Sequence, residues 1–275
     1  MAHKRELLED SSIVAVASEG RNDESLEQTE EIVQAGKHVW YDKPAGDQWE
    51  QWQQVVARAE EQELVIQMGY MFRYNEGFQH IDRWVKSGLL GEVFSVRAHM
   101  STSVGIESRR LIARHHAGGI FFDLVGHMLD QVVWLLGRPD KVTSFLRNDT
   151  GLVPEFADNN LGVFEYENAL AFVDIAAMEI PPTARRFEVY GTRGSAIMQP
   201  LDGAEQVRLC LEEAQEGYAA GEQFVQLQVQ SRQELYEREL EAFLDTIQGG
   251  RAPDRPMAHE LLVQETMLRS VGVLA

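Results

Sequence analysis

Residues 38–44 read HVWYDKP, a short apolar run that ends in two charged residues and a proline. Short runs of this kind are typical of strands buried on both faces of a parallel sheet. Similar runs flank it, IVAVA at 13–17 and LVIQM at 64–68, and the intervals between them have the apolar spacing of helices. This succession of strands and helices predicts βαβ units with right-handed crossovers.

The pattern changes from residue 71 onward. Its apolar spacing predicts helices over 75–85, 120–137, 232–247 and 258–271. Alternating residues predict strands over 93–100, 142–146, 161–166, 169–176, 187–190, 194–198, 207–211 and 224–229. We therefore predict an α/β plus α+β chain of two domains. Residues 1–70 form the domain with the parallel sheet. Residues 71–275 form a domain with a large open antiparallel sheet that has helices on one face.

Composition narrows the class of partner. The 275 residues carry 25 basic and 44 acidic side chains, a formal charge of −19, which would be repelled by nucleic acid and by anionic membranes. The charged N-terminus is unlike a signal peptide, and no apolar run approaches the ~18 residues of a membrane span. The single cysteine suggests a reducing compartment. A cytoplasmic protein that acts on a small molecule is expected.

Lys43 stands at the carboxyl end of the second predicted strand, where parallel sheets form their ligand crevices. Pro44 restricts Lys43 to extended backbone, which aims the ammonium group out of the sheet. Such a lysine can stabilise negative charge that develops on a substrate oxygen. The alternative is a loop lysine before a helix-starting proline, and these few residues alone favour that alternative.

The helix predicted over 120–137 places Asp123, His127 and Asp130 on one face. An aspartate one turn before a histidine can hold one imidazole nitrogen and leave the other free to accept a proton. Two alternatives remain open. The stripe can be a solvated face, or it can bind a metal together with His115 and His116, although no familiar zinc spacing occurs.

Residues 69–75 (GYMFRYN) follow the third predicted strand and include Arg73 and Asn75. Both are predicted to line the same crevice and to bind substrate. A salt bridge at the domain junction, for Arg73, and a helix cap, for Asn75, are equally plausible.

Together these segments resemble the glucose–fructose oxidoreductase/inositol dehydrogenase (Gfo/Idh/MocA) family. DKP at 42–44 is similar to the family's Glu-Lys-Pro, and the helix with Gly118-Gly119, Asp123, His127 and Asp130 is similar to its Gly-Gly…Asp-x-x-x-His-x-x-Asp helix. EVYGTRG at 188–194 is similar to its hairpin after the long strands. The resemblance extends from about residue 13 to the C-terminus.

The resemblance implies an NAD- or NADP-dependent oxidoreductase that transfers a hydride between nicotinamide and a sugar, polyol or related alcohol, without a metal. His127 would abstract the hydroxyl proton with Asp123 as its partner, both at the substrate, and Lys43 would bind the same oxygen. We also expect a homo-oligomer, formed through the uncovered face of the open sheet.

Cofactor contacts are expected from Asp42 and Lys43, and from Ser18, Glu19 and Asn22 after the first strand. Two departures from the family pattern stand among these positions. Asp42 replaces the usual glutamate, and residues 18–22 (SEGRN) stand where many members carry Thr-Pro and a histidine.

The glycine-rich turn of a dinucleotide-binding fold is missing from this sequence. No two glycines are separated by one residue, and only twelve residues precede Ile13, whereas one βαβ unit needs ~30 or more. We expect a family member that lacks the first half of its Rossmann domain, with weak or absent NAD(H) and NADP(H) affinity in isothermal titration. A misassigned start is favoured, because Lys43, Asp123 and His127 are all present. The alternative is a non-catalytic remnant that serves as a sugar-binding or assembly module.

Overall fold

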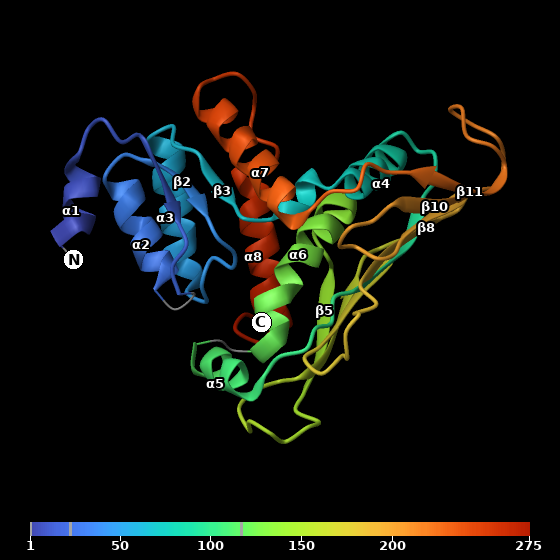
Figure 1. Cartoon of the computed structure of the whole chain (residues 1–275), viewed down its shortest axis with the longest axis horizontal. Helices are drawn as coiled ribbons and strands as arrows, with labels where there is room; N and C mark the ends of the chain where they lie inside the picture. Colours follow the sequence, from blue (N-terminus) through green and yellow to red (C-terminus); the bar gives the residue numbers. More distant parts are fainter. Residues whose placement is uncertain (1, 22–23, 116–117) are drawn as a thin grey trace.

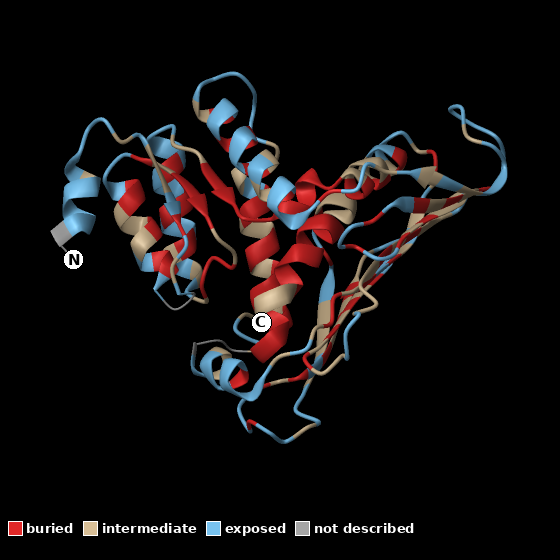
Figure 2. Ribbon diagram, in the orientation of Figure 1, coloured by how far each residue is buried: buried red, intermediate tan, exposed pale blue. Residues whose placement is uncertain are grey.

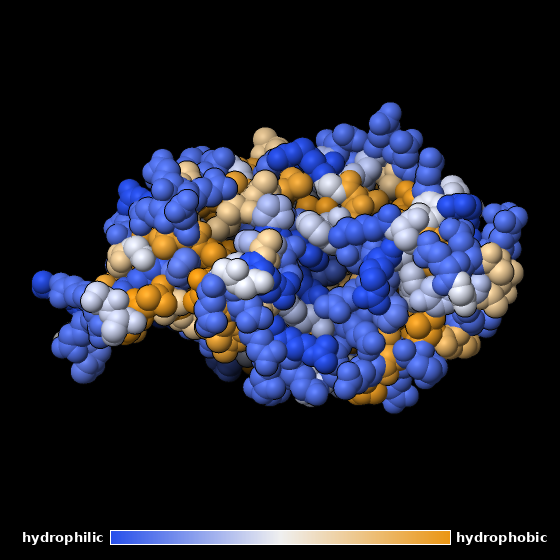
Figure 3. Space-filling view, turned by 90° about the horizontal axis from the view of Figure 1, so that it is seen from above, coloured by the Kyte–Doolittle hydropathy of each residue, from blue (hydrophilic) through white to orange (hydrophobic). Residues whose placement is uncertain are grey.

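The computed structural model describes residues 2–21, 24–115 and 118–275. Two sheets organise them, one of three strands and one of eight. In Figure 1 the small sheet and its helices lie on the left and the large sheet lies on the right. Two long helices, α6 (Gly119–Leu136) and α8 (Met257–Ser270), run between them. Seen from above, the molecule has a hollow near its middle that is bordered mainly by hydrophilic residues (Figure 3).

The small sheet confirms the predicted βαβ units. Its strands β1 (Ala15–Ser18), β2 (His38–Tyr41) and β3 (Ile66–Met68) are parallel and lie in that order. They are joined by α2 (Ser25–Gln34) and α3 (Trp49–Glu61). One stripe of α3 is fully buried because apolar residues recur there at helical spacing: Trp52, Val55, Val56 and Ala59. A further helix, α1 (Ala2–Glu9), has no counterpart in the sequence prediction.

All eight strands predicted after residue 71 are present in the large sheet, whose order is β11-β10-β9-β8-β4-β7-β6-β5. Their bounds are β4 (Val93–His99), β5 (Lys141–Arg147), β6 (Asn159–Glu165), β7 (Leu170–Ala176), β8 (Arg186–Gly191), β9 (Gly194–Met198), β10 (Gln206–Leu211) and β11 (Gly221–Gln226).

The prediction of a purely antiparallel sheet needs one correction, since β4 and β7 pair in parallel. Parallel neighbours need a long crossover, and the chain between these two strands supplies one that contains two helices and the β5–β6 hairpin. The other pairs in this sheet are antiparallel, as predicted.

Helices cover one face of the large sheet and fill the junction with the small sheet. They are the short 3-10 helix η1 (Met71–Tyr74), α4 (Glu76–Lys86), α5 (Ile106–His115), α6 (Gly119–Leu136), α7 (Arg232–Ile247) and α8 (Met257–Ser270). Buried residues gather on α6 and α8 and where α6 meets the sheet (Figure 2).

The central helix α6 is long and apolar enough to span a membrane by length and composition alone. However, 72% of that window is buried inside the fold, so α6 serves here as a core helix. Its start depends on two glycines with positive φ, Gly118 at 81° and Gly119 at 55°. A Cβ atom on Gly119 would lie 2.6 Å from the carbonyl oxygen of Ala157, which leaves no room for any side chain. The glycine pair therefore fixes where α6 begins against the sheet.

Candidate active site at the strand ends

The two segments predicted to meet in space do meet. Lys43 follows β2, and its Nζ donates a hydrogen bond of 2.9 Å to the backbone oxygen of Asp123 on α6. The same Nζ lies 3.8 Å from Oδ1 of Asp123, and the lysine side chain is only 15% exposed. A contact across 80 residues of sequence thus brings the lysine of the parallel sheet to the helix that carries His127.

His127 lies one turn after Asp123 and is 3% exposed. The rings of Tyr70 and Phe72 meet its imidazole edge-on, with centroids 6.1 and 5.4 Å away. Burial lowers the pKa of His127 well below its usual value, and the nearby charge of Lys43 lowers it further. At neutral pH the imidazole is therefore uncharged and able to accept a proton.

The predicted partnership of Asp123 with His127 needs correction. Among the described residues no hydrogen bond joins the two side chains, and Nδ1 of His127 is buried without a partner. Although positions i and i+4 share a helix face, the carboxylate of Asp123 pairs with Lys43, while the imidazole packs among aromatic rings. Asp123 therefore acts on Lys43 rather than on His127.

Asp130 and Arg73 form a buried ion network, which excludes the solvated face considered for this stripe. Asp130 is 0% exposed, accepts 3.0 and 2.7 Å bonds from Nε and Nη2 of Arg73, and pairs with Nε2 of His259 at 2.8 Å. Arg73 also donates two bonds, of 2.7 and 2.8 Å, to Glu260. Burial alone would raise the pKa of Asp130, but the charge of Arg73 holds it well below its usual range.

The substrate-binding role predicted for Arg73 and Asn75 therefore gives way to the structural alternatives. Every guanidinium nitrogen of Arg73 is committed to a buried carboxylate, so Arg73 is a junction salt bridge between η1, α6 and α8. Asn75 is the N-cap of α4, and its Oδ1 accepts hydrogen bonds from the backbone of Gly77 and Phe78.

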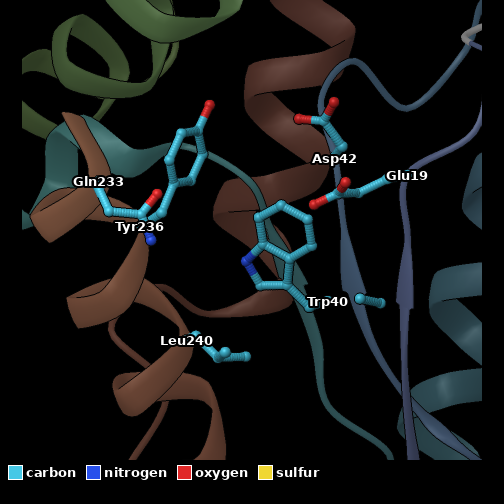
Figure 4. Close-up of a pocket in the computed structure, with 7 residues that line it drawn as sticks. Glu19, Trp40, Asp42, Gln233, Tyr236 and Leu240 are labelled. Atoms are coloured by element: carbon cyan, nitrogen blue, oxygen red, sulfur yellow. The ribbon is translucent and has the colours of Figure 1, made fainter.

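A pocket of about 440 Å³ opens at the carboxyl ends of β1 and β2. Figure 4 shows the carboxyl groups of Glu19 and Asp42 close together on one wall, with Trp40 in the middle and the ring of Tyr236 opposite. The remaining lining residues are Ala17, Gln233 and Leu240. The sequence did not predict that α7 lines this pocket. No local pattern in α7 indicates that it covers the ends of β1 and β2, which lie far away in the chain.

One oxygen of the Asp42 carboxyl group, Oδ1, accepts a 3.0 Å hydrogen bond from the adjacent backbone nitrogen of Lys43. Burial raises the pKa of Asp42, against the opposing charge of Lys43, and the charges of Glu19 and Asp123 raise it further. The charges of Lys43, Glu19 and Asp123 thus all affect the pKa of Asp42 at the strand ends.

Of the predicted cofactor positions that the structure describes, Ser18 and Lys43 do not line this pocket. Ser18 is buried and accepts a 3.3 Å bond from the hydroxyl of Thr29, so its side chain supports the sheet instead. Asn22 lies outside the described residues. Within residues 2–21, 24–115 and 118–275, no group of three acidic, histidine or cysteine side chains is placed to hold a metal ion.

The pocket fits one end of a nicotinamide dinucleotide. The paired carboxyl groups of Glu19 and Asp42 are acceptors of the kind that bind ribose hydroxyls, and aromatic rings line the space beside them. The pyrophosphate normally lies on a glycine-rich turn at a helix N-terminus, and this sequence has no Gly-x-Gly. The residues present thus fit a ribose of the dinucleotide.

Glu239 on α7 precedes the pocket-lining Leu240 and is 0% exposed. Neither of its carboxyl oxygens has a hydrogen-bond partner among the described residues. Burial raises its pKa well above the usual value. A raised pKa means that the folded state holds a proton that the unfolded state releases, so this group lowers stability as pH rises above its unfolded pKa.

We expect Glu239→Gln to stabilise the fold, by on the order of 1–3 kcal/mol at pH 8 and by less at pH 5, because the neutral amide has no proton to lose. Urea unfolding at both pH values measures this difference. Glu241→Gln, at an exposed position of the same helix, is the matched control. An equal effect of Glu239→Gln at the two pH values would show that Glu239 is not a buried neutral acid.

Comparison with known families assigns both parts of the chain. Residues 1–70 match the model described as an oxidoreductase family with an NAD-binding Rossmann fold, GFO_IDH_MocA. Residues 78–197 match the model of the GFO/IDH/MocA C-terminal domain. Together the two matches cover more than two thirds of the chain.

Individual relatives agree with these matches. The uncharacterized oxidoreductase YrbE of Bacillus subtilis is 26% identical over 199 residues, which are 70% of this chain and 57% of YrbE. The scyllo-inositol 2-dehydrogenase (NADP(+)) IolW of the same organism is 24% identical over 65% of this chain and 50% of its own length. This chain thus spans little more than half the length of these relatives. A solved levoglucosan dehydrogenase in complex with NADH has the same fold, with a TM-score of 0.84 at 16% identity, over 97% of this chain and 80% of that one.

Proposed function

Because this chain belongs to the Gfo/Idh/MocA oxidoreductase family, we propose that it transfers a hydride between NAD or NADP and a sugar, polyol or related alcohol. The observation that carries the proposal is the meeting of Lys43 with α6 beside a neutral, buried His127. Similarity to a scyllo-inositol dehydrogenase and a levoglucosan dehydrogenase favours a polyhydroxylated substrate.

Two groups of this chain act on the substrate hydroxyl. His127 accepts its proton, since an uncharged imidazole at neutral pH has a nitrogen lone pair available. The ammonium of Lys43 stabilises the negative charge that develops on the same oxygen, and its bond to the Asp123 backbone holds it in place. When bound, the nicotinamide supplies the acceptor for the hydride that leaves the carbon. The product of this oxidation is a ketone or an aldehyde.

The residues that line the 440 Å³ pocket, which include neither Lys43 nor His127, position the cofactor. Glu19 and Asp42 accept hydrogen bonds from the ribose next to the nicotinamide, and Tyr236 on α7 closes the opposite wall. Whether the cofactor is NAD or NADP is decided at the other ribose, which these groups do not contact.

The proposal is tested by incubating the chain with NAD⁺ or NADP⁺ and a panel of inositols, aldoses and anhydro sugars, while the absorbance of the reduced nicotinamide is followed. Turnover that disappears in His127→Ala supports the enzyme. Calorimetric binding of a sugar without turnover, by protein shown to be folded by circular dichroism, would favour the alternative of a non-catalytic binding module.

We also propose that the uncovered face of the large sheet joins copies of this chain. Phe172 and Leu170 on β7 and Phe145 on β5 lie on the sheet face opposite the buried Val173, with Phe145 54% and Leu170 44% exposed. An apolar sheet face that its own chain leaves uncovered is typical of an oligomer interface.

We expect Phe172→Asp to dissociate the oligomer, because it buries a carboxylate in the contact, while cross-strand pairing with Arg97 lets the monomer fold. Light scattering coupled to gel filtration measures the mass. Leu111→Asp, at a 54% exposed apolar residue of α5, is the control and should leave the mass unchanged. A wild-type chain that is monomeric at high concentration would contradict this proposal.

A further inference from the structure

A second cavity, of about 240 Å³, lies where η1, α4, α6 and the segment between α7 and α8 meet. Its volume is below the about 300–1,000 Å³ of pockets for drug-sized ligands, so only a small molecule or ion fits. The lining is dominated by charge, with four arginines and two aspartates: Arg73, Arg83, Arg251, Arg255, Asp82 and Asp254. The described residues that line it include none of the groups assigned above to hydride transfer.

Both aspartates of this cavity already have cationic or hydroxyl partners. Asp254 accepts a 2.7 Å bond from the hydroxyl of Tyr74 and pairs with the guanidinium of Arg251. Asp82 pairs with Lys86 at 2.9 Å. The other oxygen of Asp82, Oδ1, is buried without a hydrogen-bond partner among the described residues, so one carboxylate oxygen of the lining is uncommitted.

Arg255 is a largely buried cation without a counter-ion. Its guanidinium carbon lies 3.8 Å from the centroid of the Trp134 ring, and its Nη1 donates only to the backbone oxygen of Asp254, at 3.1 Å. Its Nε is buried with no partner, and no ion pair in the described parts of the chain includes Arg255. Burial lowers its pKa. Buried charges in proteins are normally paired, so an anion bound next to Arg255 would stabilise its guanidinium group.

A second unpaired cation stands at the same cavity. Arg83 on α4 is exposed and, like Arg255, takes part in no ion pair within the described segments. Arg73, by contrast, is fully neutralised by Asp130 and Glu260. Within the described residues, the cavity thus has two guanidinium groups that form no ion pair, those of Arg83 and Arg255, beside one unpartnered oxygen of Asp82.

We propose that this cavity binds a small phosphate-type oxyanion, held by Arg255 from the buried side and by Arg83 from the rim. The planar guanidinium group offers parallel N–H donors that match two oxygens of a phosphate. Arg73 and Gln131 also line the cavity, and both donate to Asp130 on α6. A bound anion would therefore contact the network that anchors the helix carrying His127.

Isothermal titration with inorganic phosphate and with glycerol 3-phosphate, at constant ionic strength set by chloride, tests the proposal. We expect both probes to bind the wild type. Arg255→Gln should weaken binding at least about tenfold, the effect of losing one charge-assisted contact. Arg83→Gln, an exposed position that does not endanger folding, should weaken it severalfold. Tighter binding of the ester would identify a phosphorylated metabolite as the source, and tighter binding of phosphate would identify the free ion.

Arg58→Gln, which removes the same charge from an exposed position of α3, is the matched control and should leave the dissociation constant unchanged. Binding that is equal in wild type, Arg255→Gln and Arg83→Gln would overturn the proposal. It would also be overturned if neither probe bound the wild type. A loss confined to Lys43→Met would place the anion at the strand ends instead, and would reject the cavity.

Discussion

Replacing Arg73 by methionine is expected to lower the free energy of unfolding by about 3–5 kcal/mol, the usual cost of removing one partner from a buried ion pair. Asp130 and Glu260 are 0% and 3% exposed, so the substitution leaves two carboxylates without their shared cation in a place that water does not reach. His259 still bonds Asp130. It cannot replace the five hydrogen bonds that the guanidinium donates to the carboxylate oxygens of Asp130 and Glu260.

Urea unfolding followed by circular dichroism measures the loss. Arg110→Met is the control, because Arg110 makes an exposed pair with Glu107 and such pairs contribute about 0–1 kcal/mol. The triple change Arg73→Met, Asp130→Asn, Glu260→Gln should recover part of the stability, since it removes the unpaired charges as well. If Arg73→Met alone were as stable as the wild type, the network would not be a buried one.

Replacing His127 by alanine is expected to lower kcat about 10²–10⁴-fold, the contribution typical of a general base. KM should change little, because a proton acceptor acts on the transition state more than on substrate binding. Circular dichroism should confirm that the cavity left among Tyr70 and Phe72 does not unfold the chain. His127→Gln, which keeps most of the volume, should lose kcat to a similar extent.

The pH profile distinguishes a base from a packing residue. Since burial lowers the pKa of His127, the imidazole stays uncharged through neutral pH, and the rate should fall only as acid pH protonates it. The fall on the acid side should therefore disappear in the residual activity of His127→Gln. His3→Ala, at the fully solvated N-terminus, is the matched control and should keep both the rate and its profile. An unchanged kcat in His127→Ala would remove the proposed mechanism.

The sequence predicted much of the fold because its signals are local. Short apolar runs end at recognisable turns, and strand alternation identified all eight strands of the large sheet. The parallel pairing of β4 with β7 could not be predicted, since register between distant strands depends on where the intervening helices pack. Helices α1 and α5 were missed because they are short, mostly exposed and rich in charged residues, so few apolar positions indicate them.

At the site, the resemblance to the family's motifs predicted that Lys43 and α6 meet, and they do. The predictions from sequence were wrong about which residues Asp123 and Arg73 contact. Asp123 pairs with Lys43 rather than with His127, and Arg73 pairs with Glu260, a residue 187 positions away. Glu239 gave no signal, since a glutamate on an amphipathic helix is ordinarily solvated.

The network around Arg73 also affects how much conformational entropy the protein loses when a substrate binds. It joins η1, α6 and α8 through buried bonds that form as the chain folds. The bond between Lys43 and the backbone of Asp123 on α6 is also present in the folded chain, so the entropy of aligning this lysine is lost during folding and not when a substrate binds. Such a site is preorganised: its affinity depends on the fit of the incoming molecule, and little of the binding energy is consumed in rearranging the protein.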